Sequence, residues 1–145
     1  MQGDPASMQQ APSYDDVVSE VSAFLLSRAR SLLGRGVSAS RIAIDPGFGF
    51  GKTDQHNFEL LEGLPAIASY EFAVLAGLSR KSQLGRITGR KTAKLRLGAS
   101  IAASLAAVRN GASIVRVHDV AETRDALLVW QALGTAITGN GAISN

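Results

Sequence analysis

The chain contains no cysteine, which excludes disulfide bonds, cysteine-ligated zinc sites and cysteine nucleophiles. It also lacks an apolar run near the ~18 residues that a membrane-spanning helix requires, and its first residues lack the basic-then-apolar order of a secretory signal. We therefore predict a cytoplasmic protein with no membrane partner, although the absence of cysteine is also compatible with export. With 46% hydrophobic and 19% charged residues, the 145-residue chain has the composition of one soluble domain with an apolar core.

Acidic residues are absent from residues 80–96, the basic segment, where seven Lys and Arg residues gather. The rest of the chain holds 8 basic and 12 acidic residues, so the basic segment alone makes the net charge positive. A run of this kind forms an anion site, a nucleic-acid arm or a solvated loop. It contains no aromatic side chain for base stacking, so we expect no nucleic-acid partner. A solvated loop remains an open alternative for residues 86–94.

The spacing of apolar residues predicts one helix followed by three strand–helix repeats. Continuous apolar runs predict strands at residues 42–44, 72–76 and 113–117. Helical spacing predicts helices at about residues 13–34, 54–63, 97–109 and 119–134. The predicted caps are Ser13 with Asp16, Asp54, and Asp119 with Glu122. Ile101, Leu105 and Val108 share one face of the third helix. We expect residues 1–134 to form the domain and residues 135–145 a flexible tail.

Short strands without polar alternation are typical of a parallel sheet covered on both faces. Right-handed crossovers bring the carboxyl ends of such strands to one edge, where α/β proteins bind ligands. Polar residues follow all three predicted strands, at residues 45–52, 79–81 and 116–119. We therefore expect these three segments to form one site.

The first of these segments, Asp45-Pro46-Gly47-Phe48-Gly49-Phe50-Gly51-Lys52, is called the glycine–phenylalanine loop. Its glycines allow backbone turns with positive φ, and its two phenylalanines are predicted to present aromatic faces to a ligand. The loop is not a phosphate-binding P-loop, because the position of that motif's first glycine is Pro46, which has no backbone N–H.

Charged side chains at the strand ends indicate how a ligand would bind. Asp45 suits a planar heterocycle with paired N–H donors, although a carboxylate here could instead cap the following turn. Arg80 and Lys81 can reach over the site or stay solvated. Arg116 is predicted to be buried, and a buried guanidinium requires an anion. Together with His118 it suits phosphate or pyrophosphate. The alternative for His118 is a structural role, which is more common for a lone histidine. Because no nucleophile–base set, metal motif or carboxylate pair is evident, catalysis would depend on positioning and on stabilising a leaving anion.

Four motifs together resemble the dihydropteroate synthase family, and they occur in that family's order. They are Met1-Gln2-Gly3-x-Pro5, the glycine–phenylalanine loop, Gly77-x-Ser79-Arg80-Lys81-Ser82 and Arg116-Val117-His118-Asp119. The resemblance implies an α/β fold that is the C-terminal part of a TIM (β/α)8 barrel, with about three parallel strands and four main helices. It also implies a transferase of folate biosynthesis, which joins a dihydropterin pyrophosphate to p-aminobenzoate with Mg²⁺ assistance and releases pyrophosphate. Sulfonamides compete with p-aminobenzoate in this family.

The resemblance also assigns roles to residues. Asp45 and Lys81 would contact the pterin, and Met1 would line its pocket. Phe50, Ser79 and Lys81 would line the p-aminobenzoate side, while Arg116 and His118 would hold the pyrophosphate. The expected substrate-binding set is Met1, Asp45, Phe50, Gly77, Ser79, Arg80, Lys81, Arg116 and His118, of which Lys81, Arg116 and His118 are the expected catalytic residues.

The match corresponds to the carboxy-terminal half of such an enzyme. The family's Mg²⁺-binding Asn and its N-terminal mobile loops have no counterpart here, so we expect no metal ligand and no turnover by this chain alone. Leu95 and Ala99 also depart from the family's usual acid and glycine. Exposed sheet edges favour association, and we expect a homodimer through the last two helices. A non-catalytic pterin- or anion-binding module is the alternative.

Overall fold

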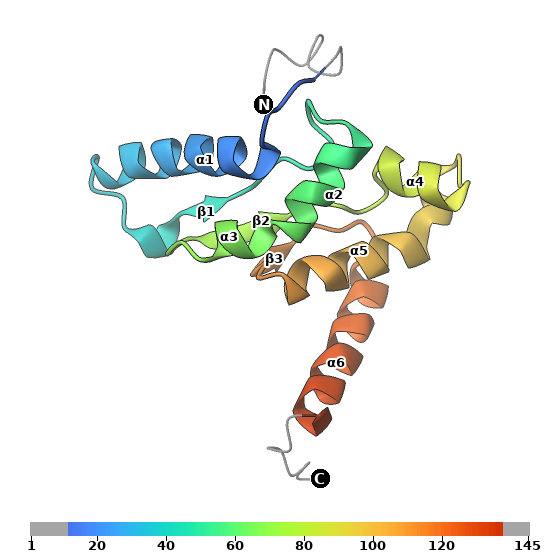
Figure 1. The fold of residues 1–145 in the computed structure, drawn as a ribbon. Coiled ribbons are helices and arrows are strands. Elements are labelled where there is room, and N and C mark those ends of the chain that lie inside the picture. Colours follow the sequence, from blue (N-terminus) through green and yellow to red (C-terminus); the bar gives the residue numbers. More distant parts are fainter. Residues whose placement is uncertain (1–11, 138–145) are drawn as a thin grey trace.

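The computed structural model describes residues 12–137, which form a three-stranded parallel sheet and its covering helices (Figure 1). The strands are β1 (Ala43–Ile44), β2 (Ala73–Ala76) and β3 (Ile114–Val115), in that order across the sheet. The helices are α1 (Val17–Leu33), α2 (Asp54–Glu62), α3 (Leu64–Ala68), α4 (Ser82–Thr88), α5 (Leu97–Arg109) and α6 (Val120–Ile137), with 3₁₀ turns η1 (Ala39–Arg41) and η2 (Ala93–Arg96). The predicted order of strands and of the four longer helices is confirmed. Met1 and most of the predicted tail lie outside the described residues.

Two short helices were not predicted. α3 begins at Leu64 with Pro65 in its first turn, a position that proline favours, although we expected the chain to leave helical structure there. α4 and η2 lie inside the basic segment, for part of which a solvated loop was an open alternative. The apolar residues of α4 are too few for a periodic signal, and its end is set by Gly89 in the left-handed conformation, with φ 68°.

The helix ends also differ from the predictions. α1 is capped by Asp16 and not by Ser13, because the Asp16 carboxylate accepts hydrogen bonds from the backbone N–H groups of Val18 and Ser19, each at 3.0 Å. α2 is capped by Thr53 in a reciprocal capping box with His56, one residue before the predicted Asp54. α6 continues through Gly134, where we expected it to end.

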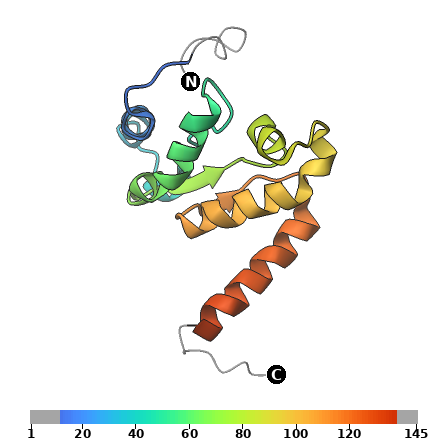
Figure 2. The same ribbon diagram turned by 45° about the vertical axis from the view of Figure 1, so that its right-hand side comes forward.

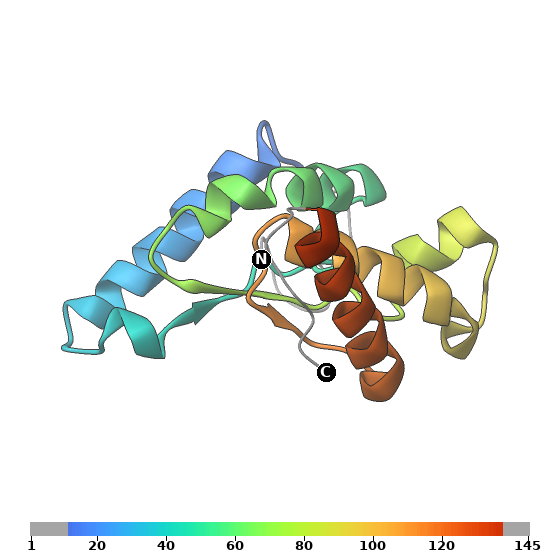
Figure 3. The ribbon, with the colours of Figure 1, turned by 90° about the horizontal axis from the view of Figure 1, so that it is seen from below.

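Helices cover one face of the sheet (Figures 2 and 3). Ile44, Val74 and Ala76 point toward the helices and are buried. The register pairs Ala43 with Ala73 and Leu75 with Ile114, which places these four residues on the opposite face, where all are at least partly exposed. The parallel arrangement is thus confirmed, and the prediction that both faces are covered is wrong for this chain. We call the uncovered side the open face.

α5 packs through small residues. Its buried positions are Ser100, Ala103, Ser104 and Ala107, and not the larger apolar residues that share its predicted face. Each buried serine hydroxyl donates to a backbone carbonyl four residues earlier, at 2.7 Å for Ser100 and 2.8 Å for Ser104, so its polarity is satisfied within the helix. Small side chains allow close approach, which a pattern based on large apolar residues misses.

α6 packs against α5 and extends away from the sheet (Figures 1 and 2). It carries exposed apolar side chains, namely Val120, Leu128, Val129, Trp130 and Leu133. In the part of the chain that the structure describes, no helix has both the length and the apolar character to cross a membrane.

Candidate functional site

The carboxyl ends of the three strands bring the predicted polar segments to one edge of the sheet. The glycine–phenylalanine loop follows β1, residues 77–81 follow β2, and residues 116–119 follow β3. The expectation that these segments meet in space is confirmed by the parallel register.

Asp45 and Arg116 approach each other across Gly77 on the open face. One Asp45 carboxylate oxygen accepts from the Gly47 N–H at 2.8 Å, so the turn-capping alternative also holds. The other oxygen lies 3.7 Å from Arg116 Nη2. A Cβ at Gly77 would lie 2.6 Å from the same Nη2, so only glycine leaves room for this crossing. The three strands thus place a carboxylate, a bare backbone and a guanidinium side by side.

Arg116 is not buried, which corrects the prediction. Its side chain is 59% exposed, because the open face leaves it facing solvent. The argument that a buried guanidinium requires an anion therefore does not apply to this chain by itself. It still lines one pocket together with Lys81 and His118.

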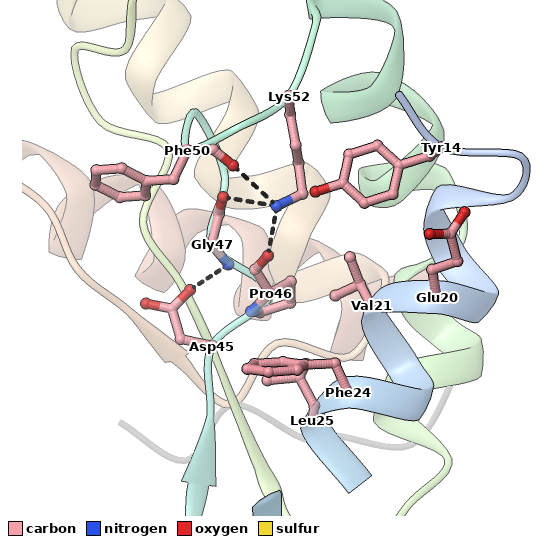
Figure 4. A pocket seen from close by; sticks show the side chains of 10 residues that line it. All are labelled: Tyr14, Glu20, Val21, Phe24, Leu25, Asp45, Pro46, Gly47, Phe50 and Lys52. Carbon is pink, nitrogen blue, oxygen red and sulfur yellow. Dashed lines mark hydrogen bonds between the residues drawn. The ribbon is translucent and has the colours of Figure 1, made fainter. Parts of the chain in front are cut away.

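The ammonium group of Lys52 lies among the carbonyl groups of the glycine–phenylalanine loop (Figure 4). Its Nζ donates to the carbonyl oxygens of Pro46 and Gly47, each at 3.1 Å, and of Phe50 at 3.3 Å. Only 6% of the residue is exposed. Burial lowers the pKa of Lys52 to about 8, although the nearby Asp45 carboxylate opposes this shift. The loop is therefore organised around a buried ammonium group.

The two phenylalanines of the loop have different environments. Phe48 is buried in the core, whereas Phe50 is 41% exposed, so one of the two aromatic faces is available to a ligand. Lys81 Nζ lies 3.9 Å from the centre of the Phe50 ring, within the range of a cation–π interaction. Partial burial and the Arg116 charge lower the pKa of Lys81, and Asp45 opposes them. A Cβ at Gly49 would lie 3.0 Å from the Lys81 side chain, so this glycine admits the lysine.

Ser79 joins the β2 and β3 segments. Its hydroxyl oxygen accepts from the His118 backbone N–H at 3.2 Å and lies 3.0 Å from His118 Nδ1. Ser79 is buried. The structure thus places Ser79 behind His118, where it orients the imidazole.

Arg80 connects the β2 segment to the β3 segment through its side chain. Its guanidinium makes two hydrogen bonds to Asp119, at 3.2 and 2.5 Å. This pairing raises the pKa of Arg80 and lowers the pKa of Asp119. This pair ties the β2 segment to the start of α6, and Arg80 also lines the cationic pocket described below.

The backbone of Arg80 is also held in place. It has φ 59°, the single positive φ of a non-glycine residue among those described. Its N–H donates to Ser100 Oγ at 2.9 Å, and its carbonyl accepts from Arg96 at 2.8 Å. Ser79 and Lys81, on either side of Arg80, are oriented by this anchor.

Two pockets flank the edge. One of about 470 Å³ lies between α1 and the glycine–phenylalanine loop, where Phe24, Leu25 and Tyr14 form walls beside Asp45 and Lys52 (Figure 4). The other, of about 420 Å³, is cationic and is lined by Gly77, Ser79, Arg80, Lys81, Ala93, Arg116, Val117 and His118. A carboxylate for a donor-rich ring and a cationic pocket for an anion thus lie side by side.

A metal site does not fit the residues described. Within residues 12–137, no three His, Asp or Glu side chains are grouped so that they could hold a metal ion. One Asp45 oxygen is occupied by Gly47 N–H, and the other faces the Arg116 guanidinium. Both oxygens of this carboxylate thus already face N–H donors of the chain.

Comparison with known proteins identifies the family. The model of the pterin binding enzyme family matches residues 1–118. The chain belongs to this family. It is 51% identical over 135 residues to a dihydropteroate synthase of Neisseria meningitidis serogroup C, covering 92% of this chain and 48% of that protein. It is 40% identical over 132 residues to dihydropteroate synthase of Escherichia coli strain K12, covering 91% and 46%. The chain thus spans about half the length of the relatives it matches.

Solved structures of pterin binding enzymes show the same fold. Dihydropteroate synthase from Stenotrophomonas maltophilia superimposes with a TM-score of 0.89 at 48% identity, over 100% of this chain and 52% of that one. The Thermus thermophilus enzyme in complex with 6HMPPP gives 0.85 at 47% identity, over 90% and 51%. The prediction of part of a (β/α)8 barrel is confirmed, and the open face is the side that faces the interior of such a barrel.

Sequence reasoning missed two features of the pterin binding enzyme site. Lys52 was considered only for a P-loop, although a lysine that ends a glycine-rich loop could have been recognised as a donor to the loop's carbonyl groups. The Arg80–Asp119 pair joins residues 39 positions apart, and no local pattern indicates it.

Proposed function

We propose that the chain forms the carboxy-terminal half of a dihydropteroate synthase active site. The reaction condenses 6-hydroxymethyl-7,8-dihydropterin pyrophosphate with p-aminobenzoate and releases pyrophosphate. The observation that carries the proposal is the meeting of the Asp45 carboxylate with the Lys81 and Arg116 cations and the His118 ring at one sheet edge. Solved relatives in complex with 7,8-dihydropteroate, 6HMPPP and 4-aminobenzoate support this choice of substrates.

The pterin would bind against Asp45. A pterin ring carries an exocyclic amino group beside a ring N–H, and such paired donors match a carboxylate. Gly77 leaves a flat floor beside Asp45, since it has no side chain. Arg116 already approaches Asp45 with a guanidinium, whose donors are arranged like those of the pterin.

The pyrophosphate would occupy the cationic pocket. Arg116 and Lys81 supply fixed positive charge, and Ser79 holds the His118 ring through Nδ1, which directs Nε2 away from the serine. Positive charge at this place stabilises the pyrophosphate as the bond from the pterin methylene carbon to its oxygen breaks and the electron pair leaves with the oxygen.

The p-aminobenzoate would lie beside the exposed ring of Phe50, with Lys81 near its carboxylate. Its aniline nitrogen attacks the methylene carbon of the pterin cation, and loss of one proton from that nitrogen completes the new C–N bond. The catalytic contribution is the placement of two substrates, because none of the described side chains at the edge is arranged as a nucleophile with a base.

Other expectations belong to the same proposal. Sulfonamides would compete at Phe50 and Lys81 because they share the aromatic amine of p-aminobenzoate. The location would be cytoplasmic, and the exposed apolar side of α6 would serve a homodimer. The family resemblance also leads us to propose Mg²⁺ assistance, although within residues 12–137 no three His, Asp or Glu side chains are grouped to hold the ion.

Calorimetry with 7,8-dihydropteroate tests the proposal. We expect binding by the wild-type chain and at least about a ten-fold loss of affinity in Asp45→Asn, since a neutral amide accepts the paired donors less well. The matched control is Asp54→Asn, which removes a carboxylate paired with Arg86 on the surface. Absence of wild-type binding, or equal affinity in both variants, would contradict the proposal. Normal steady-state turnover by this chain alone would overturn its assignment as half a site.

A further inference from the structure

Among the described residues, Lys52 makes its hydrogen bonds within the glycine–phenylalanine loop. Its three acceptors are the carbonyl groups of Pro46, Gly47 and Phe50 (Figure 4). These span almost the whole loop, so one ammonium group connects its beginning to its tip. The Tyr14 ring, whose centre lies 5.9 Å from Nζ, closes the other side.

The residues held by Lys52 are the ones that orient the proposed substrate contacts. Gly47 accepts from Lys52 through its carbonyl and donates its N–H to the Asp45 carboxylate. Phe50 accepts from Lys52, and its own N–H donates to the Gly47 carbonyl at 3.2 Å. Asp45 and Phe50 are therefore connected to each other through the lysine.

The loop needs such an outside constraint. Gly47, Gly49 and Gly51 all have positive φ, at 73°, 77° and 55°. Glycine has access to many other backbone conformations, so these residues do not themselves favour the observed one. The buried Asn57 side chain provides one anchor by accepting from the Gly49 N–H at 2.6 Å. On the carbonyl side, the Tyr14 hydroxyl donates to Gly51 at 3.1 Å and Lys52 holds the other three carbonyl groups.

The surroundings of Lys52 show that ion pairing is not what holds it. Asp45 is close enough to affect the pKa of Lys52, yet the hydrogen bonds of Nζ go to three carbonyl oxygens. Lys81 faces it with like charge, and Glu20 lines the same pocket from α1. Burying an ammonium group is costly unless its hydrogen bonds are satisfied. The buried ammonium group therefore fixes the positions of the loop carbonyl groups.

We propose that Lys52 is a positioning residue of the proposed transferase: its ammonium group fixes the loop carbonyls so that the Asp45 carboxylate and the Phe50 ring keep the relative placement in which they meet the pterin and p-aminobenzoate. The identity of these ligands rests on the proposed function. The positioning itself is a property of the unliganded chain, and can be measured without any ligand.

The absence of cysteine permits a test by chemical rescue. In a Lys52→Cys variant the new thiol is the only one in the chain. Alkylating it in denaturant with 2-bromoethylamine restores a side chain of lysine length that ends in an ammonium group, whereas bromoethane gives a matched side chain without the charge. Both products are refolded beside a wild-type sample taken through the same steps.

Two measurements report the conformation of the glycine–phenylalanine loop. The chain is labelled with para-fluorophenylalanine, and the Phe50 resonance among the five phenylalanine signals is assigned with a Phe50→Leu variant. Hydrogen exchange of the Gly47 amide reports its bond to Asp45. We expect the aminoethyl form to match wild type in both signals. In the ethyl form the Phe50 resonance shifts toward that of a solvent-exposed ring, and Gly47 exchanges at least about ten-fold faster, while Phe24, Phe58 and Phe72 keep their signals.

The outcomes separate the hypotheses. Equal Phe50 and Gly47 signals in the ethyl and aminoethyl forms would overturn the positioning role. Global unfolding of the ethyl form would also overturn it, because the ammonium would then be required by the whole fold. In calorimetry with 7,8-dihydropteroate, we expect the ethyl form to bind at least about ten-fold more weakly than the aminoethyl form. Absence of binding by wild type would count against the proposed function alone, since the ligand-free signals still decide the role of Lys52.

Discussion

At the scale of single residues, the edge of the sheet combines one carboxylate with several cations at different depths. Lys52 is buried, Lys81 lies partly buried against Phe50, and Arg116 is exposed on the open face. The deeper a cation is buried, the more its pKa is lowered, because burial removes the water that stabilises the charge. Lys52 is the most deeply buried of the three, and burial lowers its pKa to about 8.

The stability of the wild-type chain should rise with pH relative to a Lys52→Met variant. The pKa of Lys52 is about 8 in the folded chain and about 10.5 in an unfolded one. Between these values the unfolded chain binds more protons, so the free energy of unfolding of wild type increases as pH increases. Urea denaturation at several pH values measures this difference. The exposed Lys94→Met is the control, and a flat or falling difference for Lys52→Met would contradict the prediction.

A Gly77→Ala variant should weaken ligand binding with little effect on folding. The added Cβ would lie 2.6 Å from Arg116 Nη2, so the guanidinium must leave its place beside Asp45. Because the displaced group is the end of an exposed, flexible side chain, we expect less than about 1 kcal/mol lost in stability. Affinity for 7,8-dihydropteroate, measured by calorimetry, should fall several-fold. Gly98→Ala, which meets no atom within 4 Å, should leave affinity unchanged.

At the scale of elements, the β2 and β3 segments are connected by polar contacts rather than by an apolar core. Ser79 contacts His118, and Arg80 pairs with Asp119 at the start of α6. These contacts set the distance between Lys81 on one segment and Arg116 on the other. Small buried residues on α5 let that helix come close enough for Ser100 to hold the Arg80 backbone.

The Arg80–Asp119 pair should show coupling in a double-mutant cycle. Arg80→Ala and Asp119→Ala remove the same two hydrogen bonds, so the double variant should be less destabilised than the sum of the single ones. Chemical denaturation of the four proteins measures this. Since the pair lowers the pKa of Asp119, its contribution should be present above the ordinary pKa of an aspartate and should be lost as pH falls through the lowered value. Strict additivity at neutral pH would argue against the pair.

At the scale of the whole molecule, large apolar surfaces are uncovered. The open face exposes Ala43 and Ile114, and the outer side of α6 exposes Val129 and Trp130. Apolar areas of this extent favour association. The chain also spans about half the length of its relatives, whose remaining half corresponds to the rest of a barrel.

We expect concentration-dependent self-association through α6. A Val129→Glu variant places a charge on the exposed side of that helix and should shift the chain toward monomer. An Ala43→Glu variant, on the open face, should have less effect if α6 is the contact. Sedimentation equilibrium over a range of concentrations measures both. A monomeric wild type, or a shift toward monomer in Ala43→Glu alone, would contradict the prediction.

Local patterns along the chain predicted the strand–helix repeats, the parallel sheet and the gathering of Asp45, Lys81 and Arg116 at one edge. They could do so because apolar runs and strand direction depend on neighbouring residues. These patterns did not predict how deeply each side chain is buried. Arg116 is exposed and Lys52 is buried because the sheet is covered on one face and the loop folds over its own lysine. Burial, and the pairing of Arg80 with distant Asp119, depend on which elements meet in space, and sequence spacing does not record those contacts.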